Sequence, residues 1–294
     1  MPQTVVITGG TGGIGYQSAL GIAKSDSSVT IVVTGRNLKR GEAAVERLKE
    51  ESQNSNIKLA IGDVSSIAEV DALASEIGKQ VNEIDVLINN AGYLGDEMKT
   101  NEDNLELSFA INVVAPYRLA QRLLPLLEKG KEGSGKPSRV INVTGGDKPA
   151  AVDLDNLQAE KGFKGIVTYT HSKSILEALT VGMAKEFEPK GVLVNVVFPG
   201  RASTAMTQAL SSKTLPGVMK LFYPFMKLLF RKDRGESAAK AAKSSIWGAT
   251  SPDLEGVYGK YFDTNCKETP LHKTTADPDA QEKILNAVKA ALPN

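Results

Sequence analysis

Short β-branched runs alternate with longer amphipathic runs along much of the chain, and this rhythm constrains the fold more than any other feature. The strand-like runs are apolar without strict alternation, which is typical of strands covered on both faces. They lie at Thr4–Thr8, Val29–Thr34, Ile57–Ile61, Val86–Asn90, Arg139–Thr144 and Val192–Phe198. The helix-like stretches lie at Gly13–Lys24, Arg40–Glu51, Ile67–Val81, Leu105–Glu128 and Val167–Phe187. This repetition predicts a doubly wound α/β fold, with a parallel sheet and helices on both faces.

No low-complexity linker divides the chain, so we expect a single domain over residues 1–294 with an elaboration after Pro199. The elaboration includes Leu215–Arg231, the most hydrophobic and aromatic segment of the sequence. Three interpretations of that segment stay open: a helix packed on the core, a lid over an apolar substrate, or a surface that touches a membrane. Pro216 and Pro224 would divide it into two short pieces, so we predict a mobile substrate lid at about residues 205–235.

Charge and residue usage exclude several classes of protein. Lys and Arg number 35 against 34 Asp and Glu, which argues against a nucleic-acid binder that works through bulk charge. A single cysteine, Cys266, excludes an intramolecular disulfide, and with only His171 and His272 we expect no metal site. The apolar stretches are too interrupted to span a bilayer, and the first strand-like run begins at Thr4, which leaves no room for a signal peptide. We therefore expect a cytoplasmic protein.

A glycine-rich string directly follows the first expected strand and opens the first expected helix, and it reads Thr8-Gly-Gly-Thr-Gly-Gly-Ile-Gly15. Glycines there let the backbone turn tightly and approach a pyrophosphate, and the helix N-terminus offers free N–H groups. A plain tight turn is the alternative, but the position between a strand and a helix favours a dinucleotide site. The binding residues predicted here are Gly9, Thr11, Gly12, Gly13, Ile14 and Gly15.

The end of the second expected strand carries no acidic residue. An acidic side chain at this point would bind the ribose 2′-hydroxyl of NAD and repel a 2′-phosphate. Arg36 and Asn37 stand there instead, with Lys39 and Arg40 just beyond. Charge therefore favours NADP(H), with Arg36 beside the 2′-phosphate. The alternative is that these side chains only solvate the start of a helix.

With Tyr169-Thr-His-Ser-Lys173 added, the chain resembles the short-chain dehydrogenase/reductase family over nearly its whole length. The matching motifs occur in the family's order: the Thr8–Gly15 turn, Asp63-Val64, Asn89-Asn90-Ala91-Gly92, Asn112, Tyr169 with Lys173, and Pro199-Gly200 followed by Thr204. Within the family the chain looks most like the retinol-dehydrogenase-like branch, on the segments Arg36–Gly41, Asn156–Gln158, His171–Lys173 and Gly259–Phe262. The resemblance implies a Rossmann-type sheet and oxidoreductase activity.

The resemblance also implies cofactor contacts beyond the glycine turn and Arg36. They fall on Asp63, Val64, Asn90, Ala91, Gly92, Tyr169, Lys173, Pro199, Gly200, Ala202 and Thr204. Asp63 would bond the adenine amino group, and Thr204 would hold the nicotinamide carboxamide or a phosphate. The alternatives are a strand-ending turn at Asn89–Gly92 and a helix N-cap at Thr204.

Tyr169 and Lys173 are spaced i, i+4 in an expected helix, so their side chains share one face. A phenol with a pKa near 10 is a poor base at neutral pH, and a neighbouring ammonium lowers that pKa. Tyr169 would then give or take the proton of a carbonyl/alcohol pair. The resemblance implies that Asn112 holds a water that links Lys173 to solvent.

One position departs from the family pattern. In the family a serine just past the fifth strand bonds the substrate oxygen, and Gly145 stands at that position here. Losing such a donor costs roughly 10²–10³ in rate. Thr144 would supply the hydroxyl if the backbone shifts by one residue; otherwise the bond comes from elsewhere. We expect Gly145→Ser to raise turnover of a simple ketone, provided that the glycine does not need a positive φ.

The sequence therefore predicts an NADP(H)-dependent dehydrogenase/reductase that acts on a lipophilic small-molecule carbonyl or alcohol. Gly145 keeps two alternatives open: an NADP(H)-binding regulator without redox chemistry, or an enzyme that uses the site for non-redox chemistry. Family members commonly pair through their two long helices, here Leu105–Glu128 and Val167–Phe187. The resemblance thus admits a homodimer, unless the C-terminal half of the chain covers those helices.

Overall fold

The computed structural model describes residues 3–145, 150–200, 202 and 236–293. Seven strands in these ranges form one sheet of parallel neighbours, in the order β3-β2-β1-β4-β5-β6-β7. The strands are β1 (Thr4–Ile7), β2 (Thr30–Gly35), β3 (Ile57–Ile61), β4 (Val86–Asn89), β5 (Ser138–Val143), β6 (Val192–Val197) and β7 (Tyr261–Phe262). The strand order reverses between β1 and β4, and ligands of open parallel sheets bind at such a switch point. The predicted Rossmann-type sheet is confirmed.

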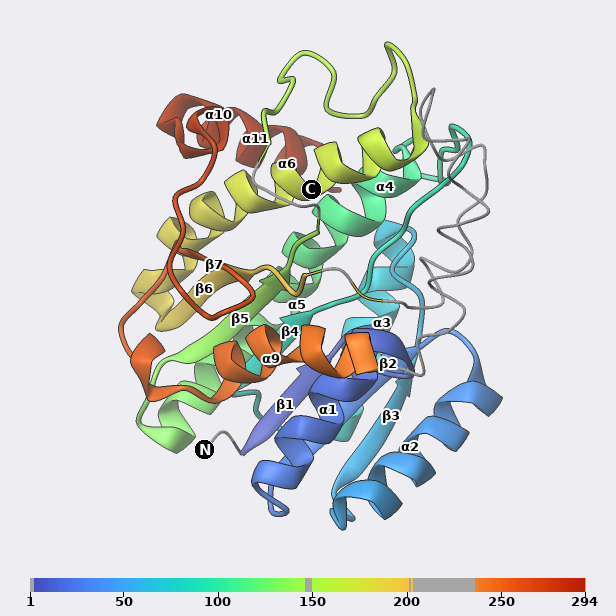
Figure 1. Ribbon diagram of the computed structural model, residues 1–294, viewed down its shortest axis with the longest axis vertical. Coiled ribbons are helices and arrows are strands. Elements are labelled where there is room, and N and C mark those ends of the chain that lie inside the picture. The colour runs from blue at the N-terminus through green and yellow to red at the C-terminus, as the bar shows by residue number, and fades with distance from the viewer. Residues whose placement is uncertain (1–2, 146–149, 201, 203–235, 294) are drawn as a thin grey trace.

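Helices cover both faces of the sheet (Figure 1). They are α1 (Gly13–Ser25), α2 (Leu38–Ser52), α3 (Ile67–Gln80), α4 (Leu107–Phe109), the π-helical segment η1 (Ala110–Val114), α5 (Ala115–Ser134), α6 (Gly165–Phe187), the short 3₁₀ segments η2 (Glu188–Lys190) and η5 (Pro252–Leu254), α9 (Glu236–Thr250), α10 (Lys273–Ala276) and α11 (Pro278–Ala290). One buried cluster joins the sheet to α1, α2 and α9, and another joins it to α3, α5, α6 and α11. The sheet is therefore apolar on both sides, as its unalternating strand sequences predict.

The long helix expected at Leu105–Glu128 is present over Leu107–Ser134, but it is not α-helical throughout. It starts as α4, widens into the π-helical η1 at Ala110–Val114, and continues as α5 to Ser134. Asn112 lies in the middle of η1. Single π-helical turns inside α-helices occur frequently at functional sites, because they redirect a side chain and its backbone.

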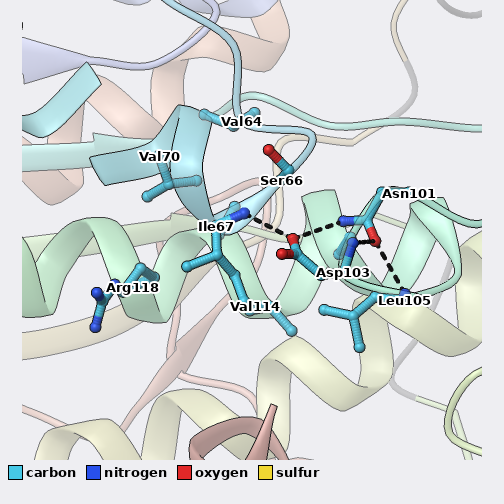
Figure 2. A pocket seen from close by; sticks show the side chains of 11 residues that line it. Val64, Ser66, Ile67, Val70, Asn101, Asp103, Leu105, Val114 and Arg118 are labelled. Carbon is cyan, nitrogen blue, oxygen red and sulfur yellow. Dashed lines mark hydrogen bonds between the residues drawn. The ribbon is translucent and has the colours of Figure 1, made fainter. Parts of the chain in front are cut away.

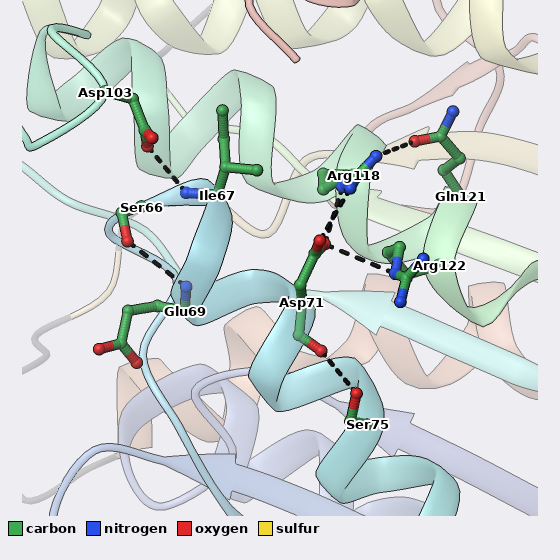
Figure 3. Close-up of polar contacts among 9 residues, drawn as sticks. All are labelled: Ser66, Ile67, Glu69, Asp71, Ser75, Asp103, Arg118, Gln121 and Arg122. Carbon is green, nitrogen blue, oxygen red and sulfur yellow. Dashed lines mark hydrogen bonds and ion pairs between the residues drawn. The ribbon is translucent and has the colours of Figure 1, made fainter. Parts of the chain in front are cut away.

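An ion pair fastens α3 to α5 (Figure 3). Arg118 contacts both carboxylate oxygens of Asp71, from Nε at 2.7 Å and from Nη2 at 2.8 Å. The guanidinium beside Asp71 lowers the pKa of that carboxyl. This bidentate geometry fixes the orientation of the two side chains as well as their distance. The pair helps to pack α3 against α5 on the face of the sheet that they cover with α6 and α11.

The C-terminal part adds elements that the sequence analysis did not predict. Helix α9 packs against α1, strand β7 extends the sheet beside β6, and α11 packs along α6 (Figure 1). Ile284 and Val288 of α11 belong to the same buried cluster as Ile175 of α6. Part of the α6 surface on which the homodimer prediction depends is therefore covered by the chain itself.

The expected lid, Leu215–Arg231 within about 205–235, lies outside the described residues, as does Thr204. Within the described ranges, no helix is both long enough and apolar enough to span a membrane.

Candidate active site

The carboxyl ends of β1 and β4 are joined by Thr8, the residue that follows β1. Its hydroxyl oxygen accepts hydrogen bonds from the backbone N–H groups of Asn90 and Ala91, both at 3.0 Å. The Asn90 side chain returns a bond from Nδ2 to the Thr8 carbonyl at 2.9 Å. The predicted Asn90–Gly92 turn thus lies directly beside the start of the glycine turn.

The glycine turn fits a pyrophosphate on two grounds. No side chain caps the N-terminus of α1 within the described residues, so the first-turn N–H groups are available to an anion. A Cβ on Gly12 would meet no atom of the described residues within 4 Å, whereas a Cβ on Gly15 would lie 2.5 Å from Asn90 Nδ2 and 2.6 Å from the Gly9 carbonyl oxygen. Gly9 itself has a φ of 64°, which favours glycine. Gly15 therefore lets the turn pack against β4, and Gly12 leaves space open above it.

The end of β2 presents its basic side chain to solvent. The Arg36 side chain is 74% exposed, and its Nη1 lies 3.6 Å from Asp63 Oδ2. Asp63 Oδ1 also accepts a hydrogen bond from the Val64 N–H at 2.7 Å. Asn37 has a structural role, because its Oδ1 accepts from the Arg40 N–H at 3.0 Å and caps α2. The structure thus brings together Arg36, which was predicted beside the 2′-phosphate, and Asp63, which was predicted beside the adenine amino group.

Val64 also lines a shallow hollow at the N-terminus of α3, which is open to solvent (Figure 2). The polar groups there already have partners. Asp103 Oδ2 accepts from the Ile67 N–H at 2.8 Å and from Asn101 Nδ2 at 3.2 Å. The hollow is therefore a joint between α3 and the segment before α4, and its polar groups are occupied by the fold.

One face of α6 carries Tyr169, Lys173 and Glu177, each four residues from the next. Three consecutive residues at the end of β5 contact this face, one for each side chain. Lys173 Nζ donates to the Val143 carbonyl at 3.0 Å, and the Thr144 hydroxyl donates to Glu177 Oε1 at 2.7 Å. The third contact joins Gly145 to Tyr169.

Gly145 packs directly on the Tyr169 phenol. A Cβ on Gly145 would overlap Tyr169 Oη and would lie 3.0 Å from Cζ. The glycine has no positive φ, so the condition attached to the Gly145→Ser expectation is met. A side chain at this position would, however, press against the phenol, so the gain from serine stays a prediction that depends on Tyr169 moving aside. Thr144, predicted as the substitute donor, has its hydroxyl directed to Glu177.

Burial dominates the protonation of the pair predicted to be catalytic. It raises the pKa of Tyr169 to about 12 and lowers the pKa of Lys173 to about 8. The expected lowering of the Tyr169 pKa by the ammonium is not what this structure shows. The cause is geometric, since Lys173 Nζ is directed to the Val143 carbonyl and lies 6.0 Å from the centre of the Tyr169 ring. Tyr169 therefore carries its proton at neutral pH.

Asn112 connects the site's elements through its side chain. Its Oδ1 accepts from the Tyr93 N–H at 2.8 Å, and its Nδ2 donates to the Tyr93 carbonyl at 2.9 Å and to Ser172 Oγ at 2.9 Å. A Cβ on Gly92 would lie 3.3 Å from Asn112 Oδ1 and 3.5 Å from Lys173 Nζ. The β4 turn, η1 and α6 thus meet around Lys173.

The remaining predicted residues follow β6. Gly200 has a φ of 83°, and a Cβ there would lie 2.9 Å from Thr264 Cγ2. Pro199 and Ala202 are buried beside it. No group of metal-ligating side chains occurs within the described ranges.

No separate role was predicted from the sequence for four residues that help to build the site: Thr8, Val143, Ser172 and Glu177. Of these, Thr8 and Ser172 lie within motifs named above. Glu177 had a detectable signal, because it continues the i, i+4 spacing of Tyr169 and Lys173 by one more turn. The others act through contacts between distant segments, such as Thr8 with Asn90.

Comparison with known proteins gives a match to one family model over most of the chain. The model described as short chain dehydrogenase matches residues 3–215. A curated polyprenol dehydrogenase from Danio rerio is 30% identical over 286 residues, which cover 96% of this chain and 84% of the relative. Retinol dehydrogenase 13 from Mus musculus is 28% identical over 285 residues, which cover 96% of this chain and 79% of the relative.

Solved structures show the same fold at lower identity. The chain aligns with a Pseudomonas aeruginosa RhlG/NADP active-site complex at a TM-score of 0.64 and 24% identity, covering 89% of this chain and 94% of the other. It aligns with an NADPH-bound carbonyl reductase from chicken fatty liver at a TM-score of 0.62 and 21% identity, covering 91% of this chain and 98% of the other.

Proposed function

The chain belongs to the short-chain dehydrogenase family, and from this premise we propose that it is an NADP(H)-dependent oxidoreductase of lipophilic carbonyl or alcohol compounds. One observation carries the proposal. Tyr169 and Lys173 share the face of α6 that meets the end of β5, in a chain whose turn after β1 fits a pyrophosphate.

The cofactor assignment rests on charge. Arg36 is exposed at the end of β2, and its contact with Asp63 is single and 3.6 Å long. An arginine held this loosely is available to pair with a 2′-phosphate. Proteins of the same fold whose descriptions name NADP or NADPH support this assignment.

When bound, NADPH supplies the hydride, with its electron pair, that reduces a carbonyl carbon. Tyr169 holds the proton at Oη that the carbonyl oxygen takes up and is left as the phenolate, and in the reverse direction the Tyr169 phenolate takes the proton from the alcohol. A pKa of about 12 keeps this proton in place at neutral pH. Lys173 supplies the buried positive charge nearby, and Asn112 holds the β4 turn and α6 in register around it.

The substrate class rests on two supports. Relatives named polyprenol dehydrogenase and retinol dehydrogenase 13 are named after lipophilic alcohols. The segment Leu215–Arg231 is apolar around most of its circumference if it is helical, which suits a cover over a lipophilic substrate.

A second function has an observation in its favour. Gly145 leaves no side chain at the position where the family places a serine, and the Thr144 hydroxyl bonds to Glu177. A protein that binds NADP(H) and has lost redox turnover would tolerate both features. This candidate predicts cofactor binding without oxidation of NADPH by any carbonyl compound.

One experiment separates the two functions. The protein is incubated with NADPH and a panel of lipophilic aldehydes, ketones and quinones, and loss of NADPH absorbance is followed. We expect turnover that falls about 10²–10⁴-fold in Tyr169→Phe, because the general acid is gone. Binding of NADPH should persist in that variant.

Tyr258→Phe is the matched control, since Tyr258 is 40% exposed and should leave turnover unchanged. Binding of NADPH without turnover of any panel member would favour the second function. Equal turnover in Tyr169→Phe and the unmodified protein would contradict the assigned role of Tyr169.

A further inference from the structure

Glu177 is a buried carboxyl group that the mechanism above does not use. Its side chain lies in α6, and the residue is 2% exposed. Oε1 accepts the Thr144 hydroxyl at 2.7 Å, while Oε2 is buried with no hydrogen-bond partner in the described part of the chain. A buried acid with an unsatisfied oxygen is costly, so its presence calls for a compensating role.

Its neighbours connect it to the Tyr169–Lys173 pair. Glu177 is one helical turn beyond Lys173, and Lys173 is one turn beyond Tyr169. The Thr144 hydroxyl that bonds Glu177 also lies 3.4 Å from the Lys173 carbonyl, and Lys173 Nζ bonds the carbonyl of Val143, the residue before Thr144. One dipeptide at the end of β5 thus holds both charged side chains.

The two buried groups act on each other's charge. Burial lowers the pKa of Lys173 to about 8, and the Glu177 carboxylate opposes that shift. Burial raises the pKa of Glu177 to about 7, and the Thr144 bond and the Lys173 ammonium oppose it. On β7, burial and then Glu177 raise the pKa of Tyr261, so this phenol stays neutral beside the carboxylate. Lys173 is therefore the positive charge that faces Glu177 among the described residues.

We infer that Glu177 is a positioning residue of the active site, which in its ionised form keeps the buried Lys173 side chain protonated beside Tyr169. This inference rests on the proposed function for its catalytic consequence, but not for its physical basis. An opposite charge one turn away favours the ammonium form in a site from which water is excluded. Without that charge, the lysine gives up its proton at lower pH.

The consequence for catalysis is a change in the shape of the pH profile. Reduction needs a protonated Tyr169 and a charged Lys173, so kcat/KM should fall on the alkaline side as Lys173 loses its proton. A second, smaller inflection should appear near pH 7 as Glu177 gains a proton and ceases to support the ammonium. A carboxyl group that only fills space would leave the alkaline limb in place when it is replaced, and it would produce no inflection near pH 7.

The test compares Glu177→Gln, Glu177→Asp and a buried control, Asp85→Asn. Glutamine can still accept from Thr144 but carries no charge, and aspartate keeps the charge on a shorter side chain. Asp85 is also buried, and it accepts from the Gln3 and Thr4 N–H groups at the opposite end of β1. Its replacement tests the loss of a buried carboxylate away from Lys173.

The first readout is the pH dependence of kcat/KM for NADPH-dependent reduction of decanal. In Glu177→Gln we expect the alkaline limb to move down by about one pH unit or more, and the inflection near pH 7 to disappear. Glu177→Asp should recover part of the shift. Asp85→Asn should lower the melting temperature and leave the profile in place.

The second readout needs no turnover. The chain is labelled with ¹³C at lysine Cε, the Lys173 resonance is assigned by its loss in Lys173→Arg, and it is titrated by NMR with and without Glu177→Gln. We expect the Lys173 pKa to fall in the variant. An unchanged Lys173 titration would overturn the inference, as would a Glu177→Gln profile that is scaled down equally at every pH. Absence of turnover in the unmodified protein would count against the proposed function alone, because the NMR titration still decides the role of Glu177.

Discussion

The glycine turn after β1 and the polar face of α6 both lie at the carboxyl ends of the parallel strands, and the chain builds them in opposite ways. At the turn, no side chain in the described part of the molecule caps α1, and none of those residues fills the space beside Gly12. On α6, Lys173 and Glu177 are buried and bonded to the end of β5. The glycine turn keeps the N–H groups at the start of α1 for a ligand, whereas the α6 face uses its polar side chains in hydrogen bonds within the protein.

This difference separates the two tasks of an active site. Groups that bind a large ligand must be reachable, so their hydrogen bonds are left for the ligand. Groups that handle a proton must be held in place and away from water before the reaction begins. We therefore expect substitutions on the α6 face to change stability and chemistry together, and substitutions at the glycine turn to change binding with little cost to the fold.

The largest expected effect is on the pH dependence of stability at Glu177. Its pKa is about 7 in the folded chain against 4.5 in the unfolded chain, so between these values the folded state holds a proton that the unfolded state has lost. Stability from this group is full below pH 4.5 and is lost as the pH rises through 7. The loss is on the order of 3 kcal/mol at most.

Urea denaturation at several pH values measures it. Unmodified protein should lose stability between pH 4.5 and 7 relative to Glu177→Gln, which has no carboxyl to titrate. In Glu177→Gln, Lys173 should have a lower pKa in the folded chain than in the unmodified protein. A lysine that gives up its proton on folding makes the folded state more stable as the pH rises, so this change adds to the difference between the two proteins. Parallel curves for the two proteins would show that Glu177 titrates normally and that the α6 face is more open than its burial indicates.

The next effect is on turnover, at Gly145. Because a Cβ there would overlap Tyr169 Oη, Gly145→Ala and Gly145→Ser should both push the phenol out of place. A displacement of about 1 Å costs about 10²-fold in rate. Steady-state kcat with saturating NADPH is the measurement, and NADPH affinity is the control. A gain in turnover with serine alone would mean that Tyr169 adjusts and that the family's missing donor is the stronger influence.

Features that lie within one strand or helix could be predicted from the sequence. The strand and helix rhythm predicted β1 to β6 within one or two residues at each end, because each strand is a short apolar run between turn residues. Strand β7 was missed, since two residues, Tyr261–Phe262, are too few to show a pattern. The i, i+4 spacing predicted Tyr169 and Lys173 on one face, and their common face on α6 is confirmed.

The close contact between Gly145 and Tyr169 could not be predicted. It depends on where β5 ends relative to α6, two segments that are joined by more than twenty residues of chain. The same holds for Thr144, which was the candidate donor to the substrate if the backbone shifted by one residue and whose hydroxyl donates to Glu177 in this structure. Sequence spacing shows which residues share an element, whereas the register between two elements comes from tertiary packing.

A third prediction compares two Arg–Asp pairs. Arg36 makes one contact with Asp63 at 3.6 Å. Arg118, in contrast, donates hydrogen bonds to both carboxylate oxygens of Asp71 (Figure 3). Arg36→Ala should reduce the preference for NADPH over NADH by about 10- to 100-fold, the worth of one charge-assisted contact, and leave the melting temperature unchanged. Arg118→Ala should do the opposite, with a loss of about 1–2 kcal/mol in stability and an unchanged preference.

Fluorescence titration with both cofactors and thermal melts give the two readouts for each variant. Equal affinities for NADPH and NADH in the unmodified protein would contradict the cofactor assignment at β2. A stability loss in Arg36→Ala as large as that in Arg118→Ala would mean that the Arg36–Asp63 contact belongs to the fold.

The smallest expected effect separates the two roles of glycine within one turn. Gly12 has an extended backbone, with φ −173° and ψ 172°, and an added Cβ would meet no atom within 4 Å in the ranges that the structure describes. Gly12→Ala should therefore fold without strain, and its stability should be equal or higher by about 0.4–1 kcal/mol, because alanine reduces the freedom of the unfolded chain. The same methyl group stands where a pyrophosphate would approach the backbone.

NADPH affinity in Gly12→Ala should thus fall by about tenfold, the worth of one ordinary hydrogen bond, while the melting temperature holds. Gly15→Ala is the matched variant, since its Cβ would lie 2.5 Å from Asn90 Nδ2 and 2.6 Å from the Gly9 carbonyl oxygen. It should lose both stability and affinity, because the turn must move away from β4 to admit the methyl group. Calorimetric titration and thermal melts on the two variants are sufficient. Unchanged NADPH affinity in Gly12→Ala would show that the cofactor does not approach through the space beside α1. The difference between the glycine turn and the α6 face would then not separate cofactor binding from proton transfer.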